Sequence, residues 1–352
     1  MVSGPKLIFR ILMISSLVLF ATSCTFIKKK LDLSGIDDIS EAILRDYQVE
    51  DRQELENYLG EKGYQYDTNE GDLEDIEVSK LDTWTLDRPI IQEKIRFPST
   101  LKKENGSADT AIFYLYRKGE LKHQKVILWI PGFGVSDFAF RFIKKFFNHE
   151  LNAGYAVLFY NIPYHLERLE KNREMGEGLF TGRVKHNLET IRHLLYEIRT
   201  AVKYLNHQEI ASISGWGGSI GGALLWLSST TIEYDHLTLM IPIVDWNTII
   251  FHKNMQEVVK LINSNGIPEN LLRSSYNSIS PMFATSKTHP NRIQILYARF
   301  DQLTPESKIL EFASKWRINQ VHSYPESHAS ILINDRLYKD YLRFLEKIAS
   351  KK

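Results

Sequence analysis

A serine surrounded by glycines near the middle of the chain has the spacing of a catalytic nucleophile. Residues 210–225 read IASISGWGGSIGGALL, and the pattern G-x-S-x-G within them places Ser219 between Gly217 and Gly221. A serine on so sharp a strand-to-helix turn needs neighbours without a Cβ, because only then does its Oγ stand clear of both elements. The pattern predicts a nucleophilic hydroxyl at Ser219, although an ordinary glycine-rich turn also fits the motif.

An earlier apolar run supplies the next part of such a site. Residues 125–130 (KVILWI) lead into residues 131–134 (PGFG). Acyl transfer needs two backbone N–H groups aimed at the oxygen that becomes negative, one after the nucleophile and one after an earlier strand. Ile220 and Phe133 occupy these places, and we predict that they form the oxyanion hole. A simple strand-ending turn is the alternative for the Pro-Gly pair.

The acid follows another short apolar strand. Residues 293–298 (IQILYA) precede Asp301, and carboxylates at this end of a parallel strand lie where open α/β sheets gather functional groups. Asp245, at the end of a predicted strand over residues 237–244, is the competing carboxylate. Asp301 is preferred because an Asp-x-x-x-Pro segment leads directly into a helix.

The chain has 11 histidines, and their positions separate them. His328 follows a short strand at residues 320–324 and precedes the last helix. A loop after the last strand lets the His328 imidazole reach over the carboxyl edge of the sheet, where it can bridge Asp301 and Ser219. His322 lies inside the strand and is predicted to be structural, whereas His289 lies in a loop without an evident partner.

The spacing of apolar segments predicts the fold that positions these side chains. Strands alternate with helices, which indicates a mostly parallel sheet covered by helices on both faces. The predicted strands are 126–130, 155–160, 211–214, 237–244, 293–298 and 321–324, and the predicted helices are 138–151, 188–205, 220–227, 305–316 and 335–348. Residues 84–97 and 111–116 are expected to open the sheet as antiparallel strands.

These motifs together resemble the serine α/β-hydrolase superfamily, with its esterases and lipases, over residues 81–352. The matching segments are GGSIG, PGFG, RFDQLTP and PESHAS. Residues 161–168 are also similar, more weakly, to the α/β-hydrolase domain protein 18 family. The resemblance implies an α/β-hydrolase fold with a cap insertion and hydrolysis of carboxylic esters through an acyl-enzyme. Pro131 departs from the pattern, since many lipases carry His or a run of glycines there.

Two insertions are candidates for binding a substrate. Residues 247–280 are too long for a simple crossover, and a helical face that includes Met255 would cover an acyl or aryl pocket or pack on the sheet. Residues 164–186 carry Arg168, Arg173 and Arg183. These three arginines, Arg168 first among them, are candidates for binding an anionic substrate group, although charged loops are usually solvated.

The N-terminus has the parts of a secretory signal. Basic residues precede an apolar run at residues 11–21, and Cys24, the single cysteine, follows three small residues as in a lipobox. We expect residues 1–24 to be a signal peptide and Cys24 to be lipidated, which would place the protein in the bacterial cell envelope as a membrane-anchored lipoprotein. An uncleaved signal anchor is the alternative, since the apolar run is short for a membrane span.

Residues 25–80 are expected to form a tether with a small helical segment, because Ile39, Ile43 and Tyr47 recur at helical spacing.

The net charge of +1 argues against nucleic acid as a partner. The sequence contains no nucleotide or metal motif, so we expect no cofactor and no metal. Two hypotheses remain: a membrane-tethered serine hydrolase of small ester or lipid substrates, and an inactive hydrolase-fold protein that serves as a binding or scaffolding module.

Overall fold

The computed structural model describes residues 25–45, 47–62, 69–81, 90–102, 108–135, 137–171 and 173–349. The predicted signal peptide, with Cys24, lies outside these ranges, as does the start of the strand expected at residue 84. Within the described ranges, no helix is both long and apolar enough to cross a bilayer.

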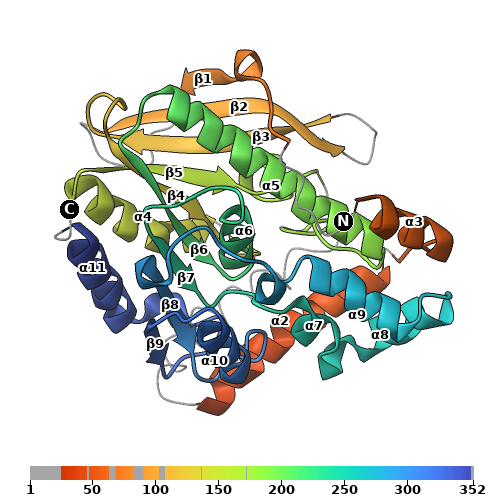
Figure 1. The fold of residues 1–352 in the computed structure, drawn as a ribbon. Helices are drawn as coiled ribbons and strands as arrows, with labels where there is room; N and C mark the ends of the chain where they lie inside the picture. The colour runs from red at the N-terminus through yellow and green to blue at the C-terminus, as the bar shows by residue number, and fades with distance from the viewer. Residues whose placement is uncertain are drawn as a thin grey trace, which may run out of the picture.

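A nine-stranded sheet forms the centre of the molecule, in the order β1-β2-β3-β5-β4-β6-β7-β8-β9 (Figure 1). The first three strands and β5 pair antiparallel, and all pairs from β5 through β4 to β9 are parallel. The strands are β1 (Glu77–Lys80), β2 (Ile91–Lys102), β3 (Ala108–Arg117), β4 (Lys125–Ile130), β5 (Tyr155–Asn161), β6 (Ser212–Gly218), β7 (Leu237–Met240), β8 (Ile293–Ala298) and β9 (Gln320–Tyr324). The predicted mostly parallel sheet is therefore confirmed.

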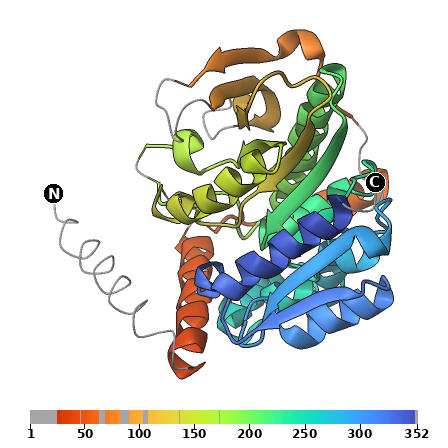
Figure 2. The ribbon, with the colours of Figure 1, turned by 90° about the vertical axis from the view of Figure 1, so that its left-hand side faces the viewer.

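Helices cover both faces of this sheet, because its central strands are apolar on both sides. Val126 and Leu128 of β4 face one core, and Ile127 and Trp129 face the other. The first core is closed by α5 (Val184–His207), α6 (Ile220–Ser228) and α10 (Glu306–Lys315), and the second by α4 (Asp137–Asn152) and α11 (Asp335–Ala349). Figures 1 and 2 show these layers.

One predicted strand ends earlier than expected. The sequence predicts residues 237–244, whereas β7 ends at Met240. Ile241 takes a positive φ of 42°, and the chain leaves the sheet there. Ile243 N–H then donates to Ser219 O at 3.2 Å, so this segment wraps the turn that holds the serine.

The insertion at residues 247–280 is helical, with α7 (Trp246–Ile250), α8 (Gln256–Ser264) and α9 (Glu269–Ser278). Short 3-10 helices complete the fold at η1 (Leu73–Asp75), η2 (Leu166–Arg168), η3 (Lys253–Met255), η4 (Pro281–Phe283), η5 (Pro290–Arg292) and η6 (Ile331–Ile333).

The segment before residue 81 packs on the rest of the chain. Helix α2 (Thr25–Arg45) contacts η3 and α8, and α3 (Arg52–Lys62) contacts α5. Between them, the buried Glu50 carboxylate accepts Val184 N–H at 2.8 Å and Lys185 N–H at 2.7 Å. These are the first N–H groups of α5, so Glu50 caps that helix in place of a local residue.

Candidate active site

Ser219 lies on a sharp turn between β6 and α6. Its backbone adopts φ 53° and ψ −117°, a conformation that costs energy for any residue with a Cβ. Its N–H donates to Met240 O at 2.9 Å. A Cβ on Gly221 would lie 2.0 Å from Ile130 O, and one on Gly217 would lie 2.5 Å from Gly221 O. The two glycines of the motif are therefore required by close backbone contact.

The structure brings Ser219, His328 and Asp301 into one hydrogen-bonded chain. His328 Nε2 lies 2.9 Å from Ser219 Oγ, and His328 Nδ1 lies 2.7 Å from Asp301 Oδ2. Because the carboxylate can only accept, Nδ1 carries the proton and Nε2 is free to accept the serine hydroxyl. Asp301 itself accepts Leu303 N–H at 2.8 Å and both the N–H and hydroxyl of Thr304, at 2.8 and 2.6 Å.

The competing side chains have other positions. Asp245 caps α7 by accepting Asn247 N–H at 3.0 Å, and Lys308 Nζ lies 3.5 Å from its carboxylate. His322 lies on β9 with Nδ1 3.9 Å from Asp340, and His289 begins the short helix η5. The hydrogen bond to His328 therefore favours Asp301 over Asp245.

The pKa of His328 lies above its usual value. Burial alone would lower it, but the neighbouring Asp301 and, more weakly, Asp32 raise it by stabilising the imidazolium. This is the direction that a base needs if it is to hold a proton taken from serine.

The predicted oxyanion-hole residues lie on either side of Ser219. Ile220 is the first residue of α6, where N–H groups lack a partner within the helix. Phe133 lies in the loop after β4, next to Gly132, whose added Cβ would be 3.3 Å from Ser219 Cβ. Both residues line the same cavity as Ser219.

Sequence reasoning missed His165, which holds the loop of Phe133 in place. Its Nε2 accepts Gly134 N–H at 2.8 Å, and its Nδ1 lies 2.8 Å from Pro163 O. The carbonyl requires a proton on Nδ1, so the ring is neutral and its tautomer is defined. Burial lowers the pKa of His165 to about 4, which preserves this state. A histidine within residues 161–168, just after a buried strand, was the signal for it.

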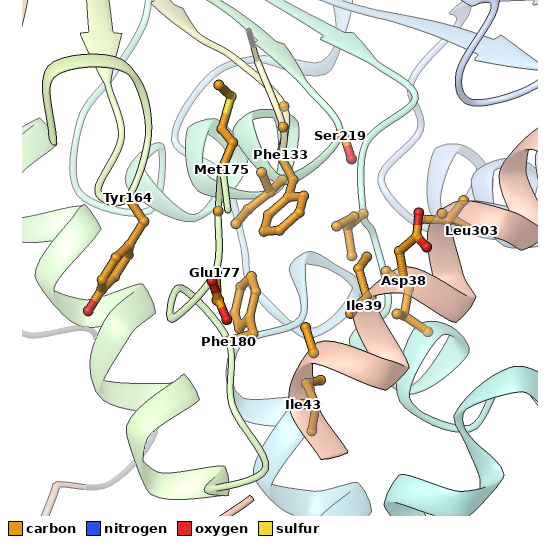
Figure 3. Close-up of a pocket in the computed structure, with 18 of the residues that line it drawn as sticks. Asp38, Ile39, Ile43, Phe133, Tyr164, Met175, Glu177, Phe180, Ser219 and Leu303 are labelled. Atoms are coloured by element: carbon orange, nitrogen blue, oxygen red, sulfur yellow. The ribbon is translucent and has the colours of Figure 1, made fainter. Parts of the chain in front are cut away.

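A cavity of about 1130 Å³ opens in front of Ser219 (Figure 3). Figure 3 shows Phe133 and Phe180 on one side and Ile39 and Ile43 of α2 on the other. Further apolar lining comes from the helical insertion, including Trp246, Ile249, Ile250 and the predicted Met255. Arg173 and Arg183 also line the cavity.

Arg168 does not line this cavity, and the prediction that it binds substrate is wrong. Its side chain is 1% exposed. All five of its N–H donors are used: Nε and Nη2 on Asp109, Nη1 and Nη2 on Glu197, and Nη1 on Asn161 O. Arg168 therefore neutralises the charges of two buried carboxylates and has no donor left for a substrate.

The role of helix α2 in the site is the second feature that sequence reasoning missed. A small helical segment is predicted there as part of a tether, and the structure also places Leu31, Asp32 and Ile39 in the cavity wall beside the catalytic candidates. The signal was a charged residue on the stripe that Ile36, Ile39 and Ile43 define, since a charge on an apolar helix face requires a specific partner. No group of three or more His, Cys, Asp or Glu side chains in the described part of the chain could hold a metal ion.

No protein-family model matches the sequence, and neither does any curated protein. Solved structures do match. Acetyl xylan esterase 1 from Thermoanaerobacterium sp. aligns with a TM-score of 0.55 and 17% identity, over 78% of this chain and 87% of that one. A prolyl endopeptidase structure aligns with a TM-score of 0.50 and 13% identity, over 76% of this chain and 38% of that one. The peroxisomal alpha-beta-hydrolase Lpx1 of Saccharomyces cerevisiae aligns with a TM-score of 0.47 and 10% identity, over 75% of this chain and 91% of that one.

At these identities the likeness concerns the fold. The strand order, the antiparallel start of the sheet and the serine on the turn after β6 agree with it. This chain therefore has the α/β-hydrolase fold, as its motifs predicted.

Proposed function

We propose that this protein is a serine hydrolase that cleaves carboxylic esters. The observation that carries the proposal is the unbroken chain of hydrogen bonds from Asp301 through His328 to Ser219, of 2.7 and 2.9 Å, with Ser219 and His328 in the wall of a cavity. A serine hydroxyl is a weak nucleophile, and this arrangement is the one that activates it.

The reaction follows from the positions of the groups. Ser219 Oγ attacks the ester carbonyl while His328 Nε2 takes its proton, and Asp301 stabilises the imidazolium. The N–H groups of Ile220 and Phe133 would donate to the oxyanion. His328 then protonates the leaving alcohol, and water, activated by the same ring, releases the acid from the acyl-enzyme.

The cavity supports an ester with an apolar acyl group as the substrate. Its volume slightly exceeds that of common small-molecule sites, and Ile43, Trp246, Ile249 and Met255 are buried in its wall. Each buried CH₂ of an acyl chain gains about 0.8 kcal/mol, so chain length should govern binding. A series of p-nitrophenyl esters of graded acyl length measures this, and we expect kcat/KM to rise from acetyl towards medium-length chains.

We also propose that the protein is attached to a membrane of the cell envelope through Cys24. The support is the basic, apolar and small-residue pattern before Cys24. An anchor there would hold one wall of the cavity near lipid. Incorporation of a labelled fatty acid into the wild-type protein, and its loss in Cys24→Ser, would support the proposal; equal labelling of both would contradict it.

A fluorophosphonate probe tests the catalytic proposal directly, because it reacts covalently with an activated serine. We expect the wild-type protein to be labelled and Ser219→Ala to be unlabelled. An unlabelled wild-type protein would favour the second hypothesis, in which the fold serves only for binding.

A further inference from the structure

Helix α2 presents one buried stripe to the rest of the molecule. Lys28, Asp32, Ile36 and Ile43 lie along this stripe at helical spacing, and each is 5% exposed or less. The last two pack in the apolar core. The first two are charged. Lys28 contacts the loop after β9, which carries His328, and Asp32 contacts both this loop and the loop after β8, which carries Asp301.

Asp32 joins these two loops to each other. Its Oδ2 accepts Gln302 N–H at 3.1 Å and His328 N–H at 3.0 Å, and its Oδ1 accepts Ala329 N–H at 3.1 Å. One donor is next to the candidate acid, and another is the backbone of the candidate base itself. Three N–H donors suit an ionised carboxylate, which only accepts.

Lys28 provides a second attachment one helical turn earlier. Its Nζ donates to Pro325 O at 2.7 Å and pairs with Glu326 at 2.8 Å. Glu326 also accepts the Ser330 hydroxyl and the Asn334 amide, and so organises the histidine loop from within. The helix therefore contacts this loop at its start and at His328.

Without α2, the two loops are joined by backbone only near the sheet. Arg299 N–H donates to Tyr324 O, and Phe300 N–H donates to Glu326 O, both at 2.9 Å. Beyond these bonds, the N–H groups that donate to Asp32 would lose their partner. The distance between the acid and the base would then be held less firmly.

We propose that Asp32 is a positioning residue of the active site, which clamps the acid loop to the histidine loop and adds a second negative charge beside His328. This inference rests on the proposed hydrolase function. It makes the segment before the hydrolase domain part of the catalytic centre.

The charges near His328 predict the direction in which its pKa should shift when Asp32 is replaced. Burial and the neighbouring Asp301 raise the pKa of Asp32, and its bonds to the histidine loop lower it in part. Asp301 and Asp32 are the carboxylates whose charges raise the pKa of His328, while Lys28 on α2 and Glu326 on the histidine loop form a pair of opposite charges. Removing the charge of Asp32 should therefore lower the pKa of His328.

Asp32→Asn tests the inference, because it keeps the volume and removes the charge. We expect kcat on a p-nitrophenyl ester to fall about 10- to 100-fold, as for a displaced catalytic group, with KM changed less than about threefold. The acidic limb of the pH profile of kcat/KM should move to lower pH. Asp37→Asn is the matched control, since it removes the same charge from an exposed position on the same helix.

A purely structural Asp32 would leave the acidic limb where it is in the folded variant, and this result, or an unchanged kcat, would overturn the inference. If Asp32→Asn does not fold, Lys28→Met decides: a kcat lowered about threefold or more supports the clamp, and a wild-type value refutes it. Failure of the proposed function has a different signature, because the wild-type protein itself would then not react with the fluorophosphonate.

Discussion

The nucleophile and the acid–histidine pair are held in place by different means. Ser219 is fixed by its own neighbours in the chain: β6 before it, α6 after it, and glycines that let the turn approach Ile130 and Pro131. Asp301 and His328 lie on two loops that a helix almost 300 residues away connects through Asp32.

This difference separates two kinds of constraint. The turn at Ser219 is sterically specified, so one added methyl group should break it. The acid–histidine loops are specified by hydrogen bonds and charge, so their geometry should be adjustable in graded steps. Variants on the two sides should therefore differ in how much activity or stability they lose.

Removal of the nucleophile should have the largest effect. Ser219→Ala is expected to lower kcat by about 10⁴- to 10⁶-fold, because no other group replaces the attacking oxygen. His328→Ala should cost about as much, and the double variant no more than either one, since the two residues act as a unit. Ester turnover with purified variants measures this. Additive losses would contradict the shared mechanism.

A methyl group added to the turn at Ser219 should destabilise the folded protein. The added Cβ of Gly221→Ala would lie 2.0 Å from Ile130 O and 2.5 Å from Pro131 O, neither of which can move freely. We expect the free energy of unfolding to fall by more than about 3 kcal/mol, measured by denaturant titration. Gly35→Ala is the counterpart on α2, where an added Cβ meets nothing within 4 Å. It should stabilise the protein by about 0.5–1 kcal/mol.

The oxyanion loop should respond less strongly than the turn. His165→Phe removes the acceptor for Gly134 N–H but keeps a ring against Phe133, and we expect kcat to fall about tenfold with little change in KM. His207→Gln, an exposed position at the end of α5, is the control. Equal activity of both variants would show that the loop is held without His165.

His165 also predicts a pH dependence of stability. Its pKa is about 4 in the folded protein and 6.5 when unfolded, so the unfolded state binds more protons between these values. Stability from this group is therefore complete above pH 6.5 and is lost as the pH falls towards 4. In His165→Phe, the free energy of unfolding should depend less steeply on pH in this window than in the wild-type protein.

The smallest effect on catalysis is expected for a substitution at Glu150 on α4. Glu150 is buried against Trp129 Nε1 and the Tyr341 hydroxyl, and burial raises its pKa to about 8. The folded state thus binds more protons between pH 4.5 and 8, and stability should fall with rising pH by about 1.4 kcal/mol per unit. Glu150→Gln should remove this slope and leave kcat within about twofold. A slope that persists in Glu150→Gln would show that other groups cause it.

Much of the fold and of the candidate site was predictable because it depends on local pattern. The apolar strands and amphipathic helices specify the layers, and the order of Ser219, Asp301 and His328 follows from the ends of three strands. The early end of β7 was not predictable, since Ile241 leaves the sheet in order to wrap the turn at Ser219.

Other roles depended on partners distant in the sequence. Arg168 is predicted from the sequence to bind an anionic substrate group, but in the structure it is buried and paired with Asp109 and Glu197. His165 and Asp32 carry no motif, because each acts on backbone N–H groups of a loop formed elsewhere in the chain.

Hydrophobic periodicity and glycine sterics act over a few residues, so the sheet, its helices and the strained turn at Ser219 follow from local sequence. That α2 forms a wall of the cavity and that Asp32 joins the loops of Asp301 and His328 depends on contacts formed in the folded chain. A carboxylate selects its donors by distance in space, and no spacing along the chain records that choice.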